Sequence, residues 1–214
     1  MLSSFPHLTD SEFIEACYHL RENFSRRGGR QNEWVSIEMA DQYDIKYITI
    51  TTALQSIEHP SSRASEDFED DEVKEEEDDD DEALPIPKDP PIMTSYDIIL
   101  SPSYRVPVLY ISILDSQHRY PPTMATLYNH LIPSQYRAQA EAGGGIGGIT
   151  TTDHPVTNNP VFFIHPCRTA EVMEASVGQR RVSAKEYLLM WIGAMGKGVG
   201  LNVPLALFER DEDE

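Results

Sequence analysis

The sequence predicts an α+β domain in which an antiparallel β-meander of about four strands has helices packed at its ends. Segments with strand character come in two closely spaced pairs, within residues 34–50 and 95–114. Helical patterns precede the first pair and follow the second. The chain has 214 residues, of which 40% are hydrophobic, and this is enough for one well-packed core.

The first helix is expected to begin after Thr9. The sequence Thr9-Asp10-Ser11-Glu12 matches a capping box, in which the Thr and Glu side chains satisfy the first free amides of a helix. Apolar residues then recur at helical intervals, at Phe13, Cys17, Leu20 and Phe24. Gly28 and Gly29 indicate its end. Because Cys17 lies on the apolar face, we interpret it as a core residue.

Four strands are expected in two hairpins. Trp34–Ile37 and Ile45–Ile50 are rich in β-branched and aromatic residues and alternate in polarity. Ser95–Leu100 and Tyr104–Leu114 follow the same pattern, and a turn at Ser101-Pro102-Ser103 separates them. Pro107 inside the last run indicates a bulge or an edge position.

The C-terminal half is expected to be mainly helical, with helices at Met124–Ile132, Arg168–Val177 and from Ser183 onward. A short apolar run, Val161–Ile164, leads into His165-Pro166-Cys167. Gly143–Gly148 has the spacing G-x-G-x-x-G, but neither a strand before it nor a helix after it is expected. We therefore interpret it as a flexible loop and not as a nucleotide site.

The charge is concentrated in two runs. The net charge is −19, and 66–82 together with 209–214 carry −17 of it. Around the first run the chain has almost no apolar residues, so we expect 58–92 to be a disordered acidic insertion and 209–214 an acidic tail. Residues 1–57 and 93–208 are then two parts of one nearly neutral core. The overall acidity therefore says little about the functional surface.

Several features indicate a cytoplasmic protein. Cys17 and Cys167 are the only cysteines, which excludes a disulfide framework and favours a reducing compartment. The opening MLSSFPHLTD lacks the basic start and apolar middle of a secretory signal. The apolar segment Tyr187–Phe208 contains Lys197 and four glycines, so we expect a buried helix followed by an extended segment and no transmembrane segment.

Cys167 is the candidate nucleophile. Pro166 ends the preceding strand and presents the thiol at a turn, and a helix is expected to begin next to it. The free amides at a helix N-terminus stabilise a thiolate, and Arg168 adds positive charge. The alternative is that Cys167 packs in the core. His165 is a candidate base, ligand or scaffold for the turn.

The residues leave several kinds of function open. His154, His165 and Cys167 match no tetrahedral zinc pattern, so we expect no metal and no cofactor. A cysteine protease would need a distant His and an orienting Asn or Asp, which the sequence does not exclude. A non-catalytic binding module also remains an alternative.

Three segments together resemble one family, the autophagy ubiquitin-like-conjugating enzymes. They are SYDIILSPSYRVPVLYI (95–111), HPVTNNPVFFIHPCRTAEVM (154–173) and YLLMWIGAMGKGVGLNVPLALF (187–208). A lipid-directed sister enzyme of the family shares His-Pro-Cys. Arg168-Thr169 and the ending Val-Gly-Leu-Asn-Val-Pro-Leu favour the branch that conjugates autophagy-related protein twelve.

The resemblance implies a ubiquitin-conjugating-like fold and a defined reaction. Cys167 would accept autophagy-related protein twelve as a thioester from the activating enzyme, autophagy-related protein seven. It would then transfer this modifier to a lysine of autophagy-related protein five during autophagosome formation. The resemblance implies no cofactor, no metal and no nucleic acid, and recruitment to autophagosome assembly sites.

One departure from the wider ubiquitin-conjugating pattern concerns the oxyanion. Those enzymes have an Asn after His-Pro, whereas here that position is Cys167 itself. The candidate donors are amides at the helix start, Asn158 or Asn159, and Tyr104. The alternative is that Tyr104 is a core residue and the two asparagines form an ordinary turn. The first hairpin, with Lys46 facing outward, is the expected surface for the acceptor protein.

Overall fold

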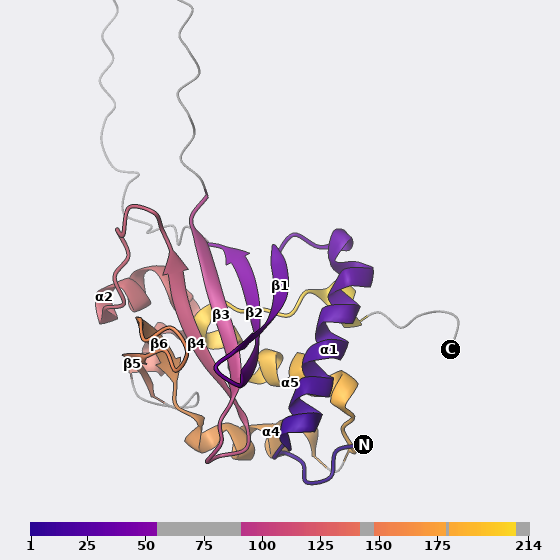
Figure 1. Ribbon diagram of the computed structural model, residues 1–214. Coiled ribbons are helices and arrows are strands. Elements are labelled where there is room, and N and C mark those ends of the chain that lie inside the picture. Colours follow the sequence, from indigo (N-terminus) through magenta and orange to yellow (C-terminus); the bar gives the residue numbers. More distant parts are fainter. Residues whose placement is uncertain (55–90, 142–147, 179, 209–214) are drawn as a thin grey trace, which may run out of the picture.

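The computed structural model describes residues 1–54, 91–141, 148–178 and 180–208 (Figure 1). The predicted acidic insertion, apart from Pro91 and Ile92, lies outside the described residues, as do the acidic tail and most of the glycine-rich loop at 143–148. The predicted α+β class is confirmed, because an antiparallel sheet carries helices at its ends and along one face.

In the described part of the chain the sheet has six strands, in the order β1-β2-β3-β4-β6-β5, and every neighbouring pair is antiparallel. Their bounds are β1 Ser36–Gln42, β2 Ile45–Ala53, β3 Met93–Leu100, β4 Pro107–Leu114, β5 Ile149–Asp153 and β6 Pro160–Ile164.

The expectation of about four strands was therefore too low. The apolar run at 161–164 is β6, and it pairs with β4 and with β5. β5 has the sequence Ile-Thr-Thr-Thr-Asp, which shows no alternation of apolar and polar residues, so periodicity could not predict it. The last predicted strand also begins later than expected, at Pro107, because residues 101–106 form the turn.

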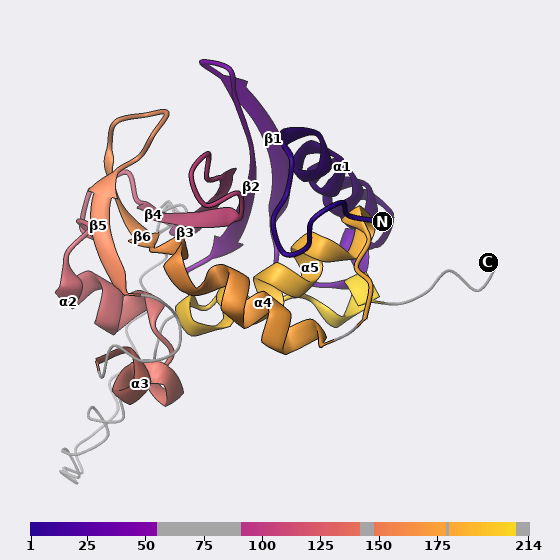
Figure 2. The same cartoon turned by 90° about the horizontal axis from the view of Figure 1, so that it is seen from below.

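In the part of the chain that the structure describes, five helices and several short turns accompany the sheet. Their bounds are α1 Asp10–Arg27, α2 Met124–Thr126 with a π turn at Leu127–Leu131, α3 Arg137–Glu141, α4 Thr169–Val177 and α5 Ala184–Met195. Figure 2 shows α4 and α5 side by side below the sheet and α1 beside β1. The predicted capping box is confirmed, because Thr9 Oγ1 accepts the Glu12 N–H and the Glu12 carboxylate accepts the Thr9 N–H.

The core lies between one face of the sheet and the helices. It contains Phe13, Cys17 and Leu20 of α1, inward residues of β2, β3, β4 and β6, and most of α5. The prediction that Cys17 is a core residue is confirmed, since it is 1% exposed.

Hydrogen bonds between distant residues close this core. Trp34 Nε1 donates to the Asn202 carbonyl at 2.7 Å, and Tyr187 donates its hydroxyl to the Pro6 carbonyl at 2.7 Å. Asn23 Nδ2 donates to the Leu207 carbonyl at 2.9 Å. Segments near the beginning and near the end of the described chain are therefore both needed to form the core.

The segment Tyr187–Phe208 contains most of α5, a 3-10 turn at Lys197–Val199, four residues without regular structure and a second 3-10 turn at Leu205–Phe208. Within the described ranges, no helix combines the length and the apolar character needed to cross a bilayer.

The opposite face of the sheet carries a smaller apolar cluster. Tyr47, Ile99 and Val156 are buried there, and Ile45 and Tyr110 pack against them. We call this side the helix-free face. Residues of this face line parts of two hollows that are described below.

The ends of β2 and β3 are direct neighbours. Ala53 pairs with Met93, and the Leu54 N–H donates to the Ile92 carbonyl at 2.8 Å. β2 and β3 are thus paired up to the points where the acidic segment leaves and re-enters the sheet. We propose that 58–92 is an insertion between two parts of one core, 1–57 and 93–208.

Deletion of residues 65–83 is therefore expected to change the melting temperature by only about 1–2 °C and to leave thioester formation unchanged. A shorter connection between paired strand ends slightly lowers the entropic cost of loop closure, and an acidic run with almost no apolar residues is expected to contribute no packing. Differential scanning fluorimetry of the full chain and the deletion variant measures the effect. A fall of 10 °C or more would show that the segment contributes packing.

Candidate active site

Cys167 lies in a short 3-10 turn, Pro166–Arg168, between the end of β6 and the start of α4. Its side chain is exposed, so the alternative of a packed core cysteine is wrong. Cys17, in contrast, is buried, and this burial raises the pKa of its thiol to about 12. Cys167 is therefore the thiol that a macromolecular substrate can reach.

His165 is the N-cap of this turn. Its Nδ1 accepts the backbone N–H of Cys167 at 3.1 Å, and its ring packs edge-on against Tyr104 and Phe163, with centroids 5.6 and 5.8 Å apart. Because the Nδ1 lone pair is occupied, the neutral ring carries its proton on Nε2. This arrangement favours a role as scaffold of the turn over a role as base.

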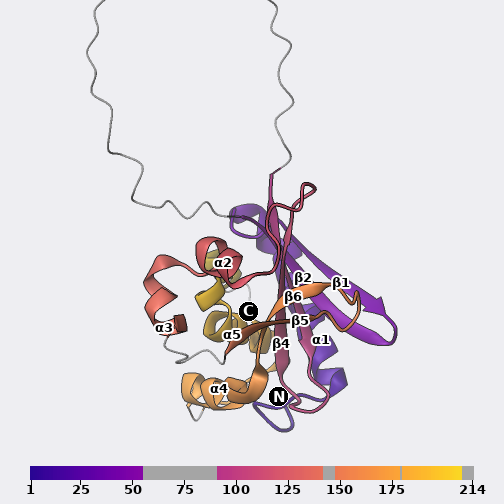
Figure 3. The ribbon, with the colours of Figure 1, turned by 90° about the vertical axis from the view of Figure 1, so that its left-hand side faces the viewer.

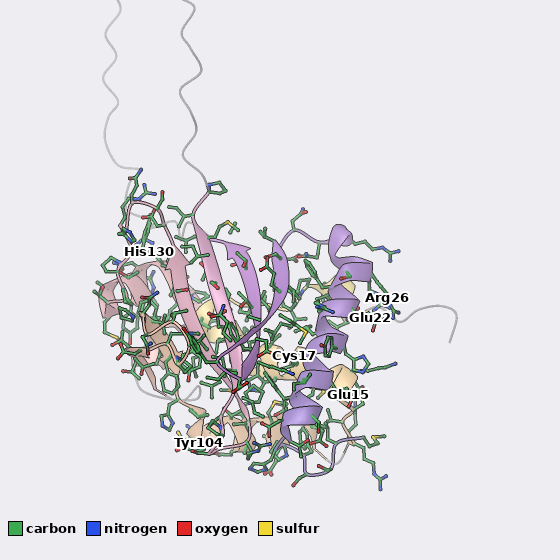
Figure 4. All side chains as sticks on the ribbon, in the orientation of Figure 1. Glu15, Cys17, Glu22, Arg26, Tyr104 and His130 are labelled. Carbon is green, nitrogen blue, oxygen red and sulfur yellow. The ribbon has the colours of Figure 1, made fainter. Side chains whose placement is uncertain are left out.

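Tyr104 lies in the turn between β3 and β4 (Figure 4). Its ring packs against that of His165. Its side chain is 43% exposed, so the alternative that it is a core residue is wrong. The turn is held in place because the Tyr104 N–H donates to Ser101 Oγ at 3.1 Å and the Arg105 side chain donates to the Leu8 carbonyl at 3.0 Å. The structure thus brings Tyr104, His165 and Cys167 into one region.

Asn158 and Asn159 lie at the other end of β6. They belong to the turn that joins β5 to β6, where Asn158 has a φ of 56° and the His154 N–H donates to the Asn159 carbonyl at 2.8 Å. The five residues of β6 span roughly 17 Å at the usual rise of a strand. The structure does not bring these asparagines to Cys167, and they form an ordinary turn.

A groove of about 580 Å³ begins at the active-site turn, and Asp10, Phe13 and Ile14 of α1 also line it. His165, Pro166 and Tyr104 line one end, and Asp44–Lys46 at the tip of the β1–β2 hairpin lines the other. Tyr110 and Phe163 lie between them. Sequence patterns could not predict this groove, because its walls come from four separate parts of the chain.

His154 is a buried residue whose role sequence reasoning missed. It is 1% exposed, and its Nδ1 accepts the N–H groups of Val156 and Thr157 at 3.3 and 3.2 Å. Its Nε2 lies 3.3 Å from Asp97 Oδ2, and Asp97 accepts the Thr49 hydroxyl at 2.6 Å.

These contacts fix the β5–β6 turn onto β2 and β3. A second hollow of about 860 Å³ begins there, with Asp97, His154 and Asn159 in its wall. His154 lies near the start of β6 and Cys167 follows its end, so these two residues are too far apart to bind one metal ion. Among the described residues, no three His, Cys, Asp or Glu side chains cluster closely enough to hold one.

The comparisons with known proteins give one consistent result. The sequence model of the family described as "Autophagocytosis associated protein, active-site domain" matches residues 12–206. A protein of Gibberella zeae is 27% identical over 231 residues, which cover 95% of this chain and 97% of that protein. A human protein is 33% identical over 119 residues, covering 54% and 52%, and one of Dictyostelium discoideum is 28% identical over 130 residues, covering 56% of each. All three are named ubiquitin-like-conjugating enzyme ATG10.

Proposed function

Because this chain belongs to the family of autophagocytosis associated proteins defined by their active-site domain, we infer that it is a ubiquitin-like-conjugating enzyme, a transferase of autophagy. The match covers nearly the whole described core and includes Cys167. The observation that supports the reaction best is the setting of this thiol, which is exposed on a turn capped by His165 and lies next to an open groove.

In the proposed reaction the Cys167 thiolate attacks the carbonyl of the C-terminal glycine of the modifier. A new thioester forms, and the thiolate of the activating enzyme leaves. The amine of an acceptor lysine then attacks this thioester, an amide bond forms, and the Cys167 thiolate leaves while the amine loses its proton to solvent. A thiolate serves both steps because it is a good nucleophile and a good leaving group.

We assign autophagy-related protein twelve as the modifier, autophagy-related protein seven as the activating enzyme and autophagy-related protein five as the acceptor. The names of the relatives support the ATG10 branch over the lipid-directed sister enzyme. Arg168-Thr169 and the sequence Val199–Leu205 support the same branch. The site residues of this proposal are Cys167 as nucleophile, His165 as scaffold and Tyr104 as an oxyanion donor.

The geometry supports a conjugating enzyme better than a protease. A cysteine protease needs a histidine that takes the thiol proton. His165, two residues from the thiol, uses its Nδ1 for the Cys167 amide instead. A non-catalytic binding module would tolerate loss of the thiol.

A non-reducing gel tests this proposal directly. The protein is incubated with activating enzyme, ATP and candidate modifiers. A band shifted by the mass of the modifier and removed by reductant is expected with autophagy-related protein twelve. A shift with the lipid-directed modifier alone would support the sister enzyme, and no shift with any modifier would overturn the carrier mechanism.

The tip of the β1–β2 hairpin is the proposed docking surface for the acceptor, because it lies at the end of the groove that begins at His165. Within this hairpin, β2 pairs with β1 and β3 on its two sides and offers only side chains, whereas β1 is an edge strand of the described sheet. Lys46 is exposed there, 3.7 Å from Asp41.

Lys46→Glu is expected to slow transfer to the acceptor about tenfold and to leave loading of Cys167 unchanged, because it reverses a charge at the far end of the groove. Lys185→Glu on the exposed side of α5 is the matched control and is expected to alter neither step. Single-round loading and chase of preloaded enzyme measure the two steps separately. Equal loss of both steps for Lys46→Glu would place the hairpin in the surface for the activating enzyme.

A further inference from the structure

One edge of the sheet is formed by β5. β6 pairs with β4 on one side and with β5 on the other, and β5 is the last strand of the described sheet. After Ile149 its residues are all exposed. Figure 3 looks onto this side of the sheet, with β5 in front of the other strands.

The register shows which main-chain groups of β5 face outward. The His165 N–H donates to the Gly148 carbonyl, and the His154 N–H donates to the Asn159 carbonyl. In an antiparallel pair the hydrogen-bonded positions alternate, so Thr150 and Thr152 bond to β6. The N–H and C=O groups of Ile149, Thr151 and Asp153 therefore point away from β6, toward the open edge.

Among the described residues, this edge lacks the features that usually prevent pairing with another chain. Exposed edges are commonly protected by lysine, proline, bulges or a covering element. β5 has a continuous register with β6 and the sequence Ile-Thr-Thr-Thr-Asp, in which only the last residue is charged. The opposite edge strand, β1, carries Glu38 and Asp41 and contacts α1.

The open edge ends beside the reactive thiol. Ile149 pairs with Ile164, which is three residues before Cys167, and Asp153 pairs with Pro160 at the other end of β6. β5 therefore runs away from Cys167. An extended peptide that pairs antiparallel to β5 runs toward Cys167 and has its C-terminus there.

We propose that the C-terminal segment of the modifier binds as a seventh strand, antiparallel to β5, with its terminal carboxyl at Cys167. This proposal rests on the proposed function. The modifier is attached through its C-terminal carboxyl, so its last residues must approach the thiol in this direction. A parallel strand would place the carboxyl near Asp153, roughly 17 Å from the active-site end of β5.

Strand addition also explains how donor and acceptor share the site. Main-chain hydrogen bonds along β5 hold the modifier at the sheet edge and do not depend on its side chains. No residue of β5 lines the groove with Tyr104 and His165, which therefore remains open for the acceptor lysine. The two substrates therefore approach the thioester from different directions.

Thr151→Pro tests the proposal, because the Thr151 N–H faces the open edge and its loss removes no bond to β6. Thr151→Val, which keeps the N–H, is the matched control. Loading from limiting charged activating enzyme is expected to slow about tenfold in Thr151→Pro and to stay within twofold in Thr151→Val. Melting temperature and alkylation of Cys167 by iodoacetamide are expected to be unchanged in both variants.

Equal loading by the two variants would overturn the strand addition, whereas failure of the unaltered protein to form any adduct would overturn the proposed function itself. If Thr151→Pro does not fold, amide hydrogen exchange in the unaltered chain gives the answer. The Thr151 and Asp153 amides are expected to exchange at least tenfold more slowly when the modifier is attached. Unchanged exchange at both amides would exclude the seventh strand.

Discussion

Cys167→Ala is expected to abolish loading and transfer, whereas Cys17→Ala is expected to leave both rates within a factor of a few. Cys167 is exposed on the active-site turn, and Cys17 is buried in α1 with a pKa raised to about 12. Removing the buried sulfur leaves a small cavity, which lowers the free energy of unfolding by about 1–2 kcal/mol without touching the site. Single-round loading and thermal melts of both variants separate chemistry from stability.

Cys167→Ser completes this test. An alkoxide is a poorer leaving group than a thiolate, so the serine variant is expected to hold the modifier as an ester that survives reductant and transfers it slowly. Comparable loss of activity from changes at Cys17 and Cys167 would show that folding explains the requirement for both cysteines. Activity in Cys167→Ala would rule out the covalent carrier.

His165→Ala is expected to slow loading and transfer by about 10- to 100-fold. The substitution removes the acceptor for the Cys167 N–H and the ring that packs against Tyr104 and Phe163. Loss of a capping side chain costs about 1 kcal/mol, and displacement of a reactive group by about 1 Å can cost 10²-fold in rate. Single-turnover loading and chase assays give the two rates.

His165→Asn is the decisive companion variant, since an asparagine oxygen can accept the same amide hydrogen. A positioning role predicts that Asn restores most of the rate lost in the alanine variant. A role as general base predicts that Asn and Ala are equally slow, because an amide does not take a proton at neutral pH. Rescue by Asn thus distinguishes scaffold from base.

Local sequence signals predicted the first helix well. The capping box at Thr9 and the spacing of Phe13 and Cys17 depend on neighbouring residues, and both interpretations are confirmed. The same signals failed for β5, whose three threonines are exposed on both faces and so show no periodicity. β5 is specified by its pairing with β6, and a pairing between separate segments is not visible in the pattern of either one.

The candidate site shows the same limit. Proline and the expected helix start next to Cys167 predicted an exposed turn, and the structure has one. Asn158 and Asn159 were candidate oxyanion donors, but the extended β6 separates them from Cys167. The proximity of Tyr104 to His165 depends on the neighbouring strands β4 and β6, which only the fold brings together.

The packing of α1 and Trp34 against α5 and residues 202–207 has a consequence for synthesis on the ribosome. Phe13 and Cys17 are covered by α5, and Trp34 and Asn23 bond to carbonyls of residues 202 and 207. A nascent chain that lacks these last segments cannot bury its first helix, although N-terminal regions generally fold first during translation. We therefore expect the core to fold only after residue 208 has left the ribosome exit tunnel. Arrest peptides placed before and after residue 208 would detect this late onset of folding force.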